Sequence, residues 1–341
     1  MISLVENLRK LINQLDEEIL KLLSKRKNLV KEVGKLKESL DLPVFDKKRE
    51  QEILSNITKR AKQLGLDIDS VFNIFGSIFQ SSRNEQQKQM PKIECNIKKI
   101  GLVGFGRFGK LIIRHLSSDF EFYIYDKKNK KKEIRKNNAT PATFNEACRQ
   151  DIVILAVPIS DMENTLKNIK NLLKKNSILI DVCSVKEYPV KLMKSILPKH
   201  VQILATHPMF GPDTAADTLD GRKIVLCKVR IQNKIYSQIK RFLESRQLNV
   251  IETTPEKHDE EIAKSLVLTH FIGRSLMAMG ISNLSIDTQG YKKLMEVLET
   301  VKHDTLQLFE DMNKHNRFSN NVRENFIKSA IKLNKKLGIR Y

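Results

Sequence analysis

Ile100-Gly101-Leu102-Val103-Gly104-Phe105-Gly106-Arg107-Phe108-Gly109 is the stretch around which the central part of the chain is organised. An apolar run leads into this G-x-G-x-x-G pattern and an amphipathic segment follows it, which predicts a strand, a tight turn and a helix. Gly104 would make the turn, Gly106 would let the backbone approach a pyrophosphate, and Gly109 would let helix and strand pack closely. The stretch therefore predicts dinucleotide binding, with the phosphates at the positive end of the helix.

An acidic residue stands where such a unit holds the adenosine ribose. The apolar segment 120–125 ends in Asp126, about twenty residues beyond the glycine turn. A carboxylate there can accept hydrogen bonds from the ribose hydroxyls and would repel a 2′-phosphate. Asp126 therefore favours NAD, while the lysines within residues 127–132 keep NADP open as the alternative cofactor.

Length and composition narrow the class of protein. With 341 residues the chain is long enough for two or three domains. No apolar run approaches the ~20 residues of a membrane span, and the charged N-terminal segment does not resemble a signal peptide, so we expect no membrane partner. The cysteines lack C-x-x-C spacing, which indicates reduced thiols in a cytoplasmic protein and no metal site; they are Cys95, Cys148, Cys183 and Cys227.

The formal net charge of +21 allows three explanations. These are nucleic-acid binding, a genome that favours lysine codons, and cationic pockets for small anionic substrates. The lysines are spread over every segment, and the sequence contains no zinc finger or RNA-recognition signature. We therefore expect no nucleic-acid partner.

The N-terminal quarter of the chain predicts only helices. Residues 2–40 contain no proline, and apolar residues recur there at three- and four-residue steps. A helix of that length, ending before Pro43, suggests a long antiparallel arrangement or a dimer. Further helices are expected over about 46–64, ending at Gly65, and from about 67 to beyond 79. A simple coiled-coil dimerisation module would explain this pattern.

Charged and polar residues interrupt these apolar stripes. Arg26 lies between Leu22 and Leu29 on the buried face of the first helix, and Lys37 lies four residues beyond Val33. On the other two helices such residues are Arg49, Glu50, Ser82 and Gln86. Desolvating several cations costs too much unless anions meet them. The pattern indicates either a site for a small, multiply charged acid or ordinary charges at helix edges.

In order and spacing, these residues together with Leu8-Arg9, Pro43-Val44 and Asp46 make residues 1–90 resemble the all-helical chorismate mutase family. The resemblance implies an intertwined helical homodimer that rearranges chorismate to prephenate without a cofactor. It also implies that Arg9 from the other subunit, Arg26 and Arg49 hold the substrate carboxylates.

The same resemblance assigns the remaining residues of that site. Lys37 and Gln86 would hydrogen-bond the ether oxygen as its bond breaks. Glu50 would hold the ring hydroxyl, with Asp46 and Ser82 in support. The rearrangement is unimolecular and needs no proton transfer, so catalysis consists of enforcing the reactive conformer and stabilising charge on oxygen.

An α/β pattern follows. Residues 151–158 form a continuous apolar run, as expected for a parallel strand covered on both faces. Further strands are expected over 178–182, 201–205 and 223–227. These strands predict a Rossmann-type sheet behind the N-terminal helices.

Two polar clusters, residues 184–186 and 206–212, come just past expected strand ends, where ligands bind in open α/β sheets. The second contains His207 within Thr-His-Pro-Met-Phe-Gly-Pro. A histidine at such a place is either a hydrogen-bonded structural group or the proton acceptor during hydride transfer.

The glycine loop, both polar clusters, Val157-Pro158 and His258-Asp259 followed by His270 resemble, over about residues 97–315, the prephenate/arogenate dehydrogenase family. The resemblance implies NAD-dependent oxidation of a cyclohexadienol with loss of carbon dioxide. His207 would take the hydroxyl proton, Ser184 would orient that histidine or the hydroxyl, and His270 would lie along the substrate. The expected cofactor-binding residues are Gly104, Phe105, Gly106, Arg107, Phe108, Gly109, Asp126, Val157 and Pro158.

The substrate could be prephenate, arogenate or both. Bifunctional bacterial members of the family carry an arginine in the helix after His270, and Thr300 stands at that position here. The region around Asp304 looks more like plant-type arogenate dehydrogenases, in which an acid there pairs with the arogenate ammonium. The alternative role of Asp304 is a helix cap or a surface charge. Arogenate is therefore slightly favoured.

We expect a multidomain fold of three parts. Residues 1–90 would form the all-α mutase domain, 91–97 a linker, 98–254 the NAD-binding Rossmann-type domain, and 255–341 an all-α substrate and dimerisation domain. Two other readings of the chain are a different NAD-linked dehydrogenase with a helical dimerisation arm, and a basic, NAD-sensing nucleic-acid-binding regulator.

Overall fold

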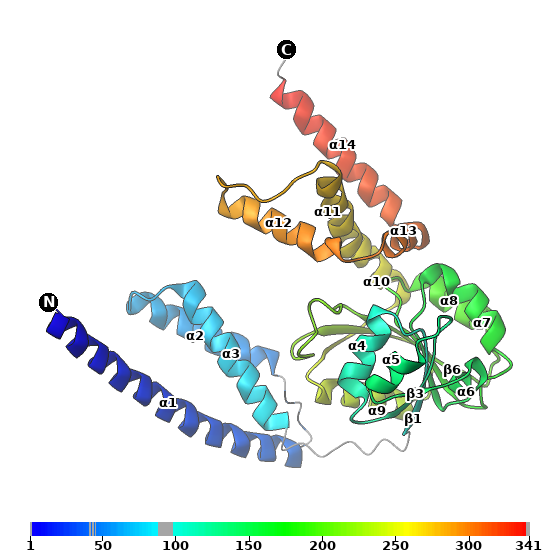
Figure 1. Ribbon diagram of the computed structural model, residues 1–341, viewed down its shortest axis with the longest axis horizontal. Coiled ribbons are helices and arrows are strands. Elements are labelled where there is room, and N and C mark those ends of the chain that lie inside the picture. The colour runs from blue at the N-terminus through cyan, green and yellow to red at the C-terminus, as the bar shows by residue number, and fades with distance from the viewer. Residues whose placement is uncertain (1, 41, 43, 45, 88–97, 339–341) are drawn as a thin grey trace. The chain divides into compact units, whose positions relative to one another are not determined.

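The computed structural model describes residues 2–40, 42, 44, 46–87 and 98–338. In chain order these are helices, an α/β sheet with its helices, and helices again (Figure 1), which confirms the expected fold class. The expected linker and Cys95 lie outside the described residues. Within the described ranges, no helix combines the length and apolarity needed to cross a membrane.

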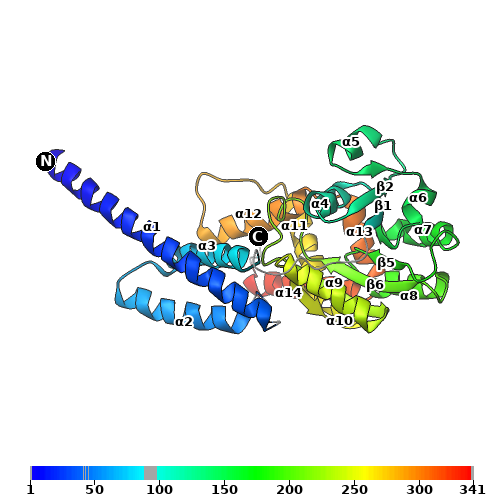
Figure 2. The same cartoon turned by 90° about the horizontal axis from the view of Figure 1, so that it is seen from below.

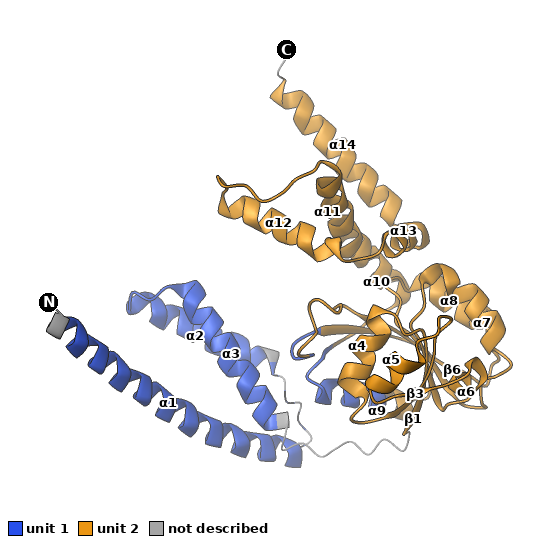
Figure 3. Ribbon diagram, viewed as in Figure 1, with its two compact units in different colours: residues 1–94, 219–222, 237–249 blue, residues 95–218, 223–236, 250–341 orange. Residues whose placement is uncertain are grey.

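The chain divides into two compact units (Figure 3). The first unit contains residues 1–94, 219–222 and 237–249, and the second unit contains residues 95–218, 223–236 and 250–341. Two short segments that follow the G-x-G-x-x-G region in sequence thus belong to the same unit as the N-terminal helices.

Three helices make up most of the first unit: α1 (Ile2–Ser39), α2 (Lys47–Gln63) and α3 (Ile68–Gln87), as predicted. Asp46 begins α2 because its side chain accepts a hydrogen bond from the backbone N–H of Arg49 at 2.9 Å. Helix α3 packs against both α1 and α2. The N-terminal part of α1 projects beyond α2 and α3 (Figure 2).

The sheet has eight strands in the order β3-β2-β1-β4-β5-β6-β7-β8. They are β1 (Lys99–Val103), β2 (Glu121–Tyr125), β3 (Thr140–Pro141), β4 (Ile152–Leu155), β5 (Ile178–Asp181), β6 (Gln202–Pro208), β7 (Lys223–Arg230) and β8 (Asn249–Glu252). Strands β1 to β6 pair in parallel, and β7 pairs antiparallel with β6. The strand order reverses between β1 and β4, which is the switch point where doubly wound sheets bind ligands.

The sheet is covered by helices that the apolar patterns only partly predicted. They are α4 (Arg107–Leu116), α5 (Lys131–Lys136), α6 (Phe144–Cys148), a 3₁₀ turn (Ile159–Asp161), α7 (Met162–Ile169) and α8 (Glu187–Ile196). Helix α9 (Asn233–Ser245) follows β7 in the chain, and most of it belongs to the first unit. Side chains of α7 and α8 pack with those of β4, β5 and β6 in one core, in which Leu155, Met162, Met193 and Ile203 are fully buried. All four residues of β4 are buried, as expected for a strand covered on both faces.

The prediction that His207 follows a strand end was wrong. Strand β6 continues through His207 to Pro208 because β7 pairs with it there, His207 opposite Val225 and Pro208 opposite Ile224. His207 is therefore held by backbone hydrogen bonds of the sheet and is buried, so its position is more rigid than that of a loop residue.

The C-terminal helices are α10 (Pro255–Ile262), α11 (Leu268–Ala278), α12 (Gln289–Lys302), α13 (Leu306–His315) and α14 (Ser319–Leu337). A π turn at Ala263–Val267 separates α10 from α11. Helix α11 packs against α12 and α14 (Figure 1). His258 before the π turn and His270 after it are both buried.

Gly101 is required for the contact between β1 and α6. A Cβ at this residue would lie 1.7 Å from the backbone oxygen of Ala147, so Gly101→Ala must push α6 off the sheet. We expect a loss of about 2–3 kcal/mol in the free energy of unfolding, measured by denaturant titration. Gly211→Ala is the control, because a Cβ there meets no atom within 4 Å. Equal stability of the two variants would contradict this packing.

Candidate active sites

A cleft of about 740 Å³ opens at the switch point between β1 and β4. Gly104 has a φ of +103°, and a Cβ there would lie 2.3 Å from the backbone oxygen of Ala156. A Cβ on Gly109 would lie 2.3 Å from the oxygen of Gly104, whereas a Cβ on Gly106 would meet nothing within 4 Å. The loop is thus tightly packed against backbone at Gly104 and Gly109 and open at Gly106, which lines the cleft. This arrangement fits the close approach of a pyrophosphate.

Five of the nine predicted cofactor-binding residues line this cleft: Gly104, Gly106, Asp126, Val157 and Pro158. The side chains of the other loop residues point elsewhere. Phe105 is fully buried, Phe108 lies near Phe210, and Arg107 donates to both carboxylate oxygens of Asp213 at 2.7 Å. Any contact of these residues with a dinucleotide would therefore come from their backbone.

Asp126 lines the same cleft as the glycine loop. Its carboxylate accepts hydrogen bonds from the backbone N–H groups of Phe105 and Lys128, both at 2.8 Å, and from Lys130 Nζ at 3.3 Å. Burial raises the pKa of Asp126, but these donors outweigh it and hold the pKa below its usual value. The carboxylate is ionised at neutral pH, and Lys127, Lys128 and Lys130 line the same cleft.

A second cluster combines His207 with two residues of α10. His207 Nδ1 lies 2.8 Å from His258 Nε2, and His258 Nδ1 lies 2.7 Å from Asp259 Oδ1. Asp259 is fully buried, and its two oxygens also accept the backbone N–H groups of Lys186 (2.7 Å) and Glu187 (2.9 Å) at the start of α8. The three side chains form a continuous hydrogen-bonded chain.

The direction of each hydrogen bond follows from Asp259. A carboxylate that accepts from two backbone N–H groups can only accept from His258, so Nδ1 of His258 carries the proton. His258 Nε2 is then an acceptor, and His207 must donate to it from Nδ1. This leaves the lone pair of His207 Nε2 free to take a proton from a bound hydroxyl.

His207 is also kept neutral. Burial lowers its pKa well below the ordinary histidine value, and the neighbouring His258 and Lys186 lower it further. A neutral imidazole is the form that can act as a base at physiological pH.

Ser184 follows β5, and its Oγ is buried with no hydrogen-bond partner among the described residues. The loop that carries it is anchored by a buried ion pair, because Lys186 Nζ donates to Asp181 Oδ2 and to the backbone oxygen of Thr206. Breaking such a pair is costly, since it would leave a charge buried without a partner. A substrate hydroxyl is one group that could satisfy Ser184 Oγ.

His270 and Asp304 are brought together by α11 and the turn after α12. His270 Nε2 lies 3.5 Å from Asp304 Oδ2, and Arg107 Nη1 lies 4.0 Å from Asp304 Oδ1. Burial lowers the pKa of His270, although Asp304 raises it in part. The cap of α13 is Thr305, whose side chain accepts from the backbone N–H of Leu308, so Asp304 is not the capping residue.

In the first unit the helices bring several predicted mutase residues together. Arg26 of α1 donates to Ser82 of α3, and Lys37 of α1 donates to the backbone oxygen of Val44 at 2.8 Å. Burial lowers the pKa of Lys37, while the carboxylates of Asp46 and Glu50 raise it. Gln86 Oε1 is buried and unpaired within the described part of the chain.

Two predicted mutase residues lie apart from this cluster. Arg49 is exposed and lies 3.4 Å from Glu52 on the same helix. Arg9 is exposed on α1. Glu50 instead pairs with Arg83, at 2.6 Å, a residue that sequence reasoning missed because it lies outside the resemblance motif and beside the apolar stripe of α3.

His258, Asp259 and Lys186 also carry roles that the sequence pattern did not assign. Their motifs were recognised, but 51 residues separate His258 from His207, and no periodicity connects α10 with β6. The sequence pointed to these residues only as members of the motifs that carry the resemblance.

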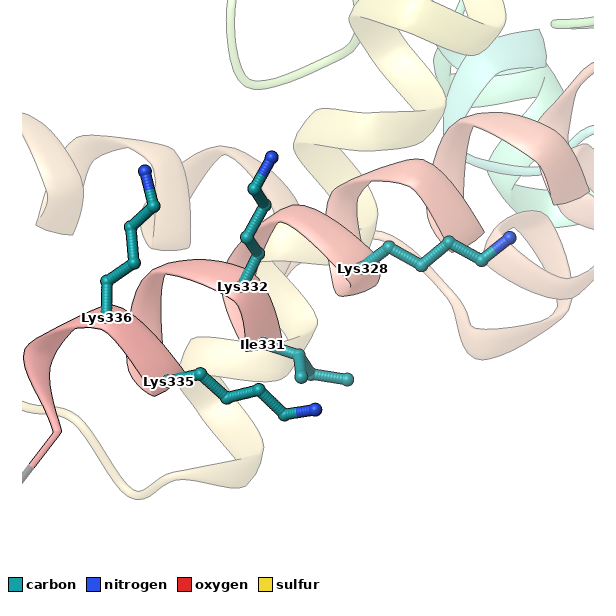
Figure 4. A pocket seen from close by; sticks show the side chains of 5 residues that line it. All are labelled: Lys328, Ile331, Lys332, Lys335 and Lys336. Carbon is teal, nitrogen blue, oxygen red and sulfur yellow. The ribbon is translucent and has the colours of Figure 1, made fainter. Parts of the chain in front are cut away.

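The lysine-rich end of α14 forms a shallow hollow around Ile331 (Figure 4). The side chains of Lys332 and Lys336 extend to one side of the helix, whereas those of Lys328 and Lys335 extend away from it. They do not converge on one point, as they would around a bound anion. Among the described residues, no group of three or more His, Cys, Asp or Glu side chains could hold a metal ion.

The fold and the two clusters define a class of protein: a chain with a Rossmann-type dinucleotide-binding sheet and a buried histidine pair, preceded by a helical unit with a cationic cluster. Known families match the same regions. Residues 8–87 match chorismate mutase type II, residues 113–252 match the prephenate dehydrogenase nucleotide-binding domain, and residues 275–340 match the TYRAAT1-like C-terminal domain.

Individual relatives cover both parts. The chain is 32% identical over 230 residues to arogenate dehydrogenase 2, chloroplastic, of Arabidopsis thaliana, covering 64% of each, which is less than two thirds of that relative. It is 29% identical over 271 residues to a T-protein of Haemophilus influenzae, covering 78% of this chain and 68% of the T-protein. It is 30% identical over 99 residues to a chorismate mutase of Methanocaldococcus jannaschii, covering 29% of this chain and 100% of that enzyme.

Prephenate dehydrogenase from A. aeolicus, solved with hydroxyphenyl propionate and NAD+, shares the fold with a TM-score of 0.58 at 20% identity, over 72% of this chain and 92% of that one. The chain belongs to the chorismate mutase type II family through its N-terminal helices, and residues 113–252 behind them match the prephenate dehydrogenase nucleotide-binding domain. These matches lend no support to a nucleic-acid-binding regulator or to an unrelated dehydrogenase.

The hydrogen-bond chain predicts how His207 titrates. Because its pKa is lowered, His207 should stay neutral, with the proton on Nδ1, as the pH falls through about 6.5, where an ordinary histidine is half protonated. Nitrogen-15 NMR of the imidazole measures both properties, and His207→Gln assigns the signal. Asp259→Asn replaces an acceptor by a donor and should abolish the preference for Nδ1. An ordinary titration of His207, or a proton on Nε2, would contradict the proposed chain.

Proposed function

We propose that the protein is a bifunctional enzyme of tyrosine biosynthesis. The helical unit would rearrange chorismate to prephenate, and the second unit would oxidise and decarboxylate prephenate, arogenate or both, with NAD as the cofactor. The observation that carries the dehydrogenase assignment is His207, buried and neutral, with Nε2 freed by the bonds to His258 and Asp259.

Bound in the cleft at the switch point, NAD would supply the hydride acceptor. The loop 104–109 would hold its pyrophosphate through backbone N–H groups, and the ionised Asp126 would accept from the ribose hydroxyls. Because Asp126 already accepts from Lys130 and two backbone groups, its negative charge is partly neutralised. NADP therefore stays in the proposal as a weaker alternative.

The residues of the second unit would direct the proton. His207 Nε2 takes the proton of the ring hydroxyl as the hydride leaves the same carbon, carbon dioxide departs, and the ring becomes aromatic. His258 and Asp259 hold the imidazole in the tautomer that can do so. Ser184 Oγ would hydrogen-bond the substrate hydroxyl, and His270 would lie along the ring.

Asp304 supports arogenate over prephenate. The neighbouring His270 has a lowered pKa and is neutral at physiological pH, and Arg107 is already held by both oxygens of Asp213. The carboxylate of Asp304 thus keeps charge to offer a ligand. Arogenate carries an ammonium that could pair with it, whereas the keto side chain of prephenate offers no cation.

We expect the purified protein to reduce NAD with L-arogenate, and more slowly with prephenate. Asp304→Asn should lower kcat/KM for arogenate by roughly 10- to 100-fold, the value of a hydrogen bond to a charged group, and leave prephenate within about threefold. The measurement is NAD reduction with both substrates side by side and NADP as a parallel acceptor.

Glu299→Gln is the matched control, because Glu299 is an exposed acid of α12 paired with Lys302. Turnover of prephenate alone by the unmodified protein would rule out the Asp304 pairing. If neither substrate were oxidised, the dehydrogenase assignment itself would fail.

The helical unit would act by charge and shape alone. Arg26, with Arg9 and Arg49, would bind the two carboxylates of chorismate, and Lys37 and Gln86 would hydrogen-bond the ether oxygen. The partly buried ammonium of Lys37 supports this, because it can donate to that oxygen. Gln86 would donate from Nε2, while its buried and unpaired Oε1 could accept from another group of the ligand.

A homodimer is part of this proposal. Apolar side chains along α1 are more than half exposed, namely Leu4, Leu8, Leu11, Leu15, Ile19, Leu22 and Leu29. A stripe of this length is unusual on a monomer and indicates a protein partner, here a second copy of the chain. Such a dimer would bring Arg9 of one subunit to the site of the other.

Subunit mixing tests the dimer and Arg9 together. Arg9→Ala and Arg26→Ala should each abolish mutase activity, because each removes a carboxylate contact from every site. In a mixed dimer, one of the two sites keeps both arginines. Random pairing makes half of the co-expressed dimers mixed, so about one quarter of the unmodified activity should return. Mixing two samples of Arg26→Ala is the control. No recovery in mixed dimers confirmed by mass would contradict the contribution of Arg9 across the interface.

A further inference from the structure

Arg83 on α3 holds two carboxylates at once. Its Nη1 donates to Glu50 Oε1 at 2.6 Å, its Nε donates to Asp220 Oδ1 at 2.9 Å, and its Nη2 donates to Asp220 Oδ2 at 3.3 Å. The Arg83 side chain is 14% exposed and that of Asp220 is 3% exposed. All three residues belong to the first unit.

The two carboxylates are held differently. Asp220 takes the Nε and Nη2 edge of the guanidinium with both oxygens, which is the bidentate geometry that fixes the plane of an arginine. Glu50 takes only Nη1, with a single oxygen, so Oε2 stays available to accept from another donor. Asp220 thus orients Arg83, and Arg83 orients Glu50.

Charge keeps this arrangement together. Burial lowers the pKa of Arg83, whereas the hydrogen bonds and charges of Asp220 and Glu50 raise it. The two carboxylates outweigh burial, so the pKa lies above its usual value. Removing either acid would take one carboxylate partner from a largely buried guanidinium, and the guanidinium could then turn toward the acid that remains.

Asp220 does not come from the mutase helices. It lies outside residues 8–87, within the part that matches the dehydrogenase nucleotide-binding domain. Its segment is tied to α3 a second time, because Gly221 N–H donates to the oxygen of Gln247 at 2.9 Å and Gln247 Nε2 donates to Asn84 Oδ1 at 2.7 Å. Asn84, the residue after Arg83, is therefore hydrogen-bonded to Gln247, which in turn is hydrogen-bonded to Gly221 beside Asp220.

We propose that Asp220, acting through Arg83, is a positioning residue for Glu50, and so for the ring hydroxyl of chorismate. The inference rests on the proposed mutase function. It makes the mutase site dependent on a segment contributed by the dehydrogenase part of the sequence.

Asp220→Asn in the full-length protein tests the proposal. The substitution weakens the bidentate pair between Asp220 and Arg83. Arg83 is then no longer held in one orientation, and Glu50 loses its fixed position. The bond between the ring and its hydroxyl is neither formed nor broken in the rearrangement, so we expect this contact to contribute about equally to substrate and transition state. We expect KM for chorismate to rise roughly three- to tenfold, and kcat to stay within about twofold. A merely structural role would lower the amount of active enzyme, which reduces kcat at constant KM.

Asp217→Asn is the matched control, because Asp217 is an exposed acid three positions away, and its KM should not change. Arg83→Lys keeps the positive charge but cannot form the bidentate pair with Asp220. It should therefore raise KM as Asp220→Asn does. Dehydrogenase turnover and thermal unfolding of each variant check that the protein is folded.

An unchanged KM in Asp220→Asn, or an equal rise in Asp217→Asn, would overturn the inference. An additive effect of Asp220→Asn and Arg83→Lys in the double variant would do so as well, because residues that act in series should not add. Absence of mutase activity in the unmodified protein would overturn the mutase assignment and this inference together. Normal activity with an unchanged KM would overturn this inference alone.

Discussion

The carboxylate of Asp259 is the interaction on which the second unit depends. It is fully buried, and it joins the start of α8, through two backbone N–H groups, to His258 on α10. Its backbone oxygen accepts from Asn316, which ties α10 to the turn before α14. A buried carboxylate without these donors would be strongly destabilising. The requirement that it be satisfied therefore fixes how the C-terminal helices meet the sheet, and the same bonds set the tautomer of His207.

The two proposed sites solve different chemical problems. The dehydrogenase site needs a base, so burial, helped by His258 and Lys186, keeps His207 neutral while a hydrogen-bond chain frees one nitrogen. The mutase site needs no proton transfer, and its residues are cations and amides that remain charged or polar throughout. This difference explains why the helical unit presents Arg26, Lys37 and Gln86 without a titrating base.

Acidic partners decide which of the many cations can bind a ligand. Arg107 is held by Asp213, and Arg83 is shared between Glu50 and Asp220. Lys186 is buried against Asp181. By contrast, the lysines on α14 point apart and line no enclosed site (Figure 4). The net charge of +21 is therefore distributed between structural ion pairs and solvated side chains, with a few arginines and lysines left for anionic substrates.

Local patterns in the sequence were enough to predict the three N-terminal helices, the glycine turn before α4, the buried strand β4 and the acid at the end of β2, because each depends on periodicity or on a short motif. They were also enough for the family, since its motifs are read from residue types and their order and spacing along the chain. The tertiary structure alone decided that His207 lies within β6, because that depends on pairing with β7. It alone joined His207 to His258 and Arg83 to Asp220, because contacts between residues far apart in the chain are set by packing and leave no periodic trace in the sequence.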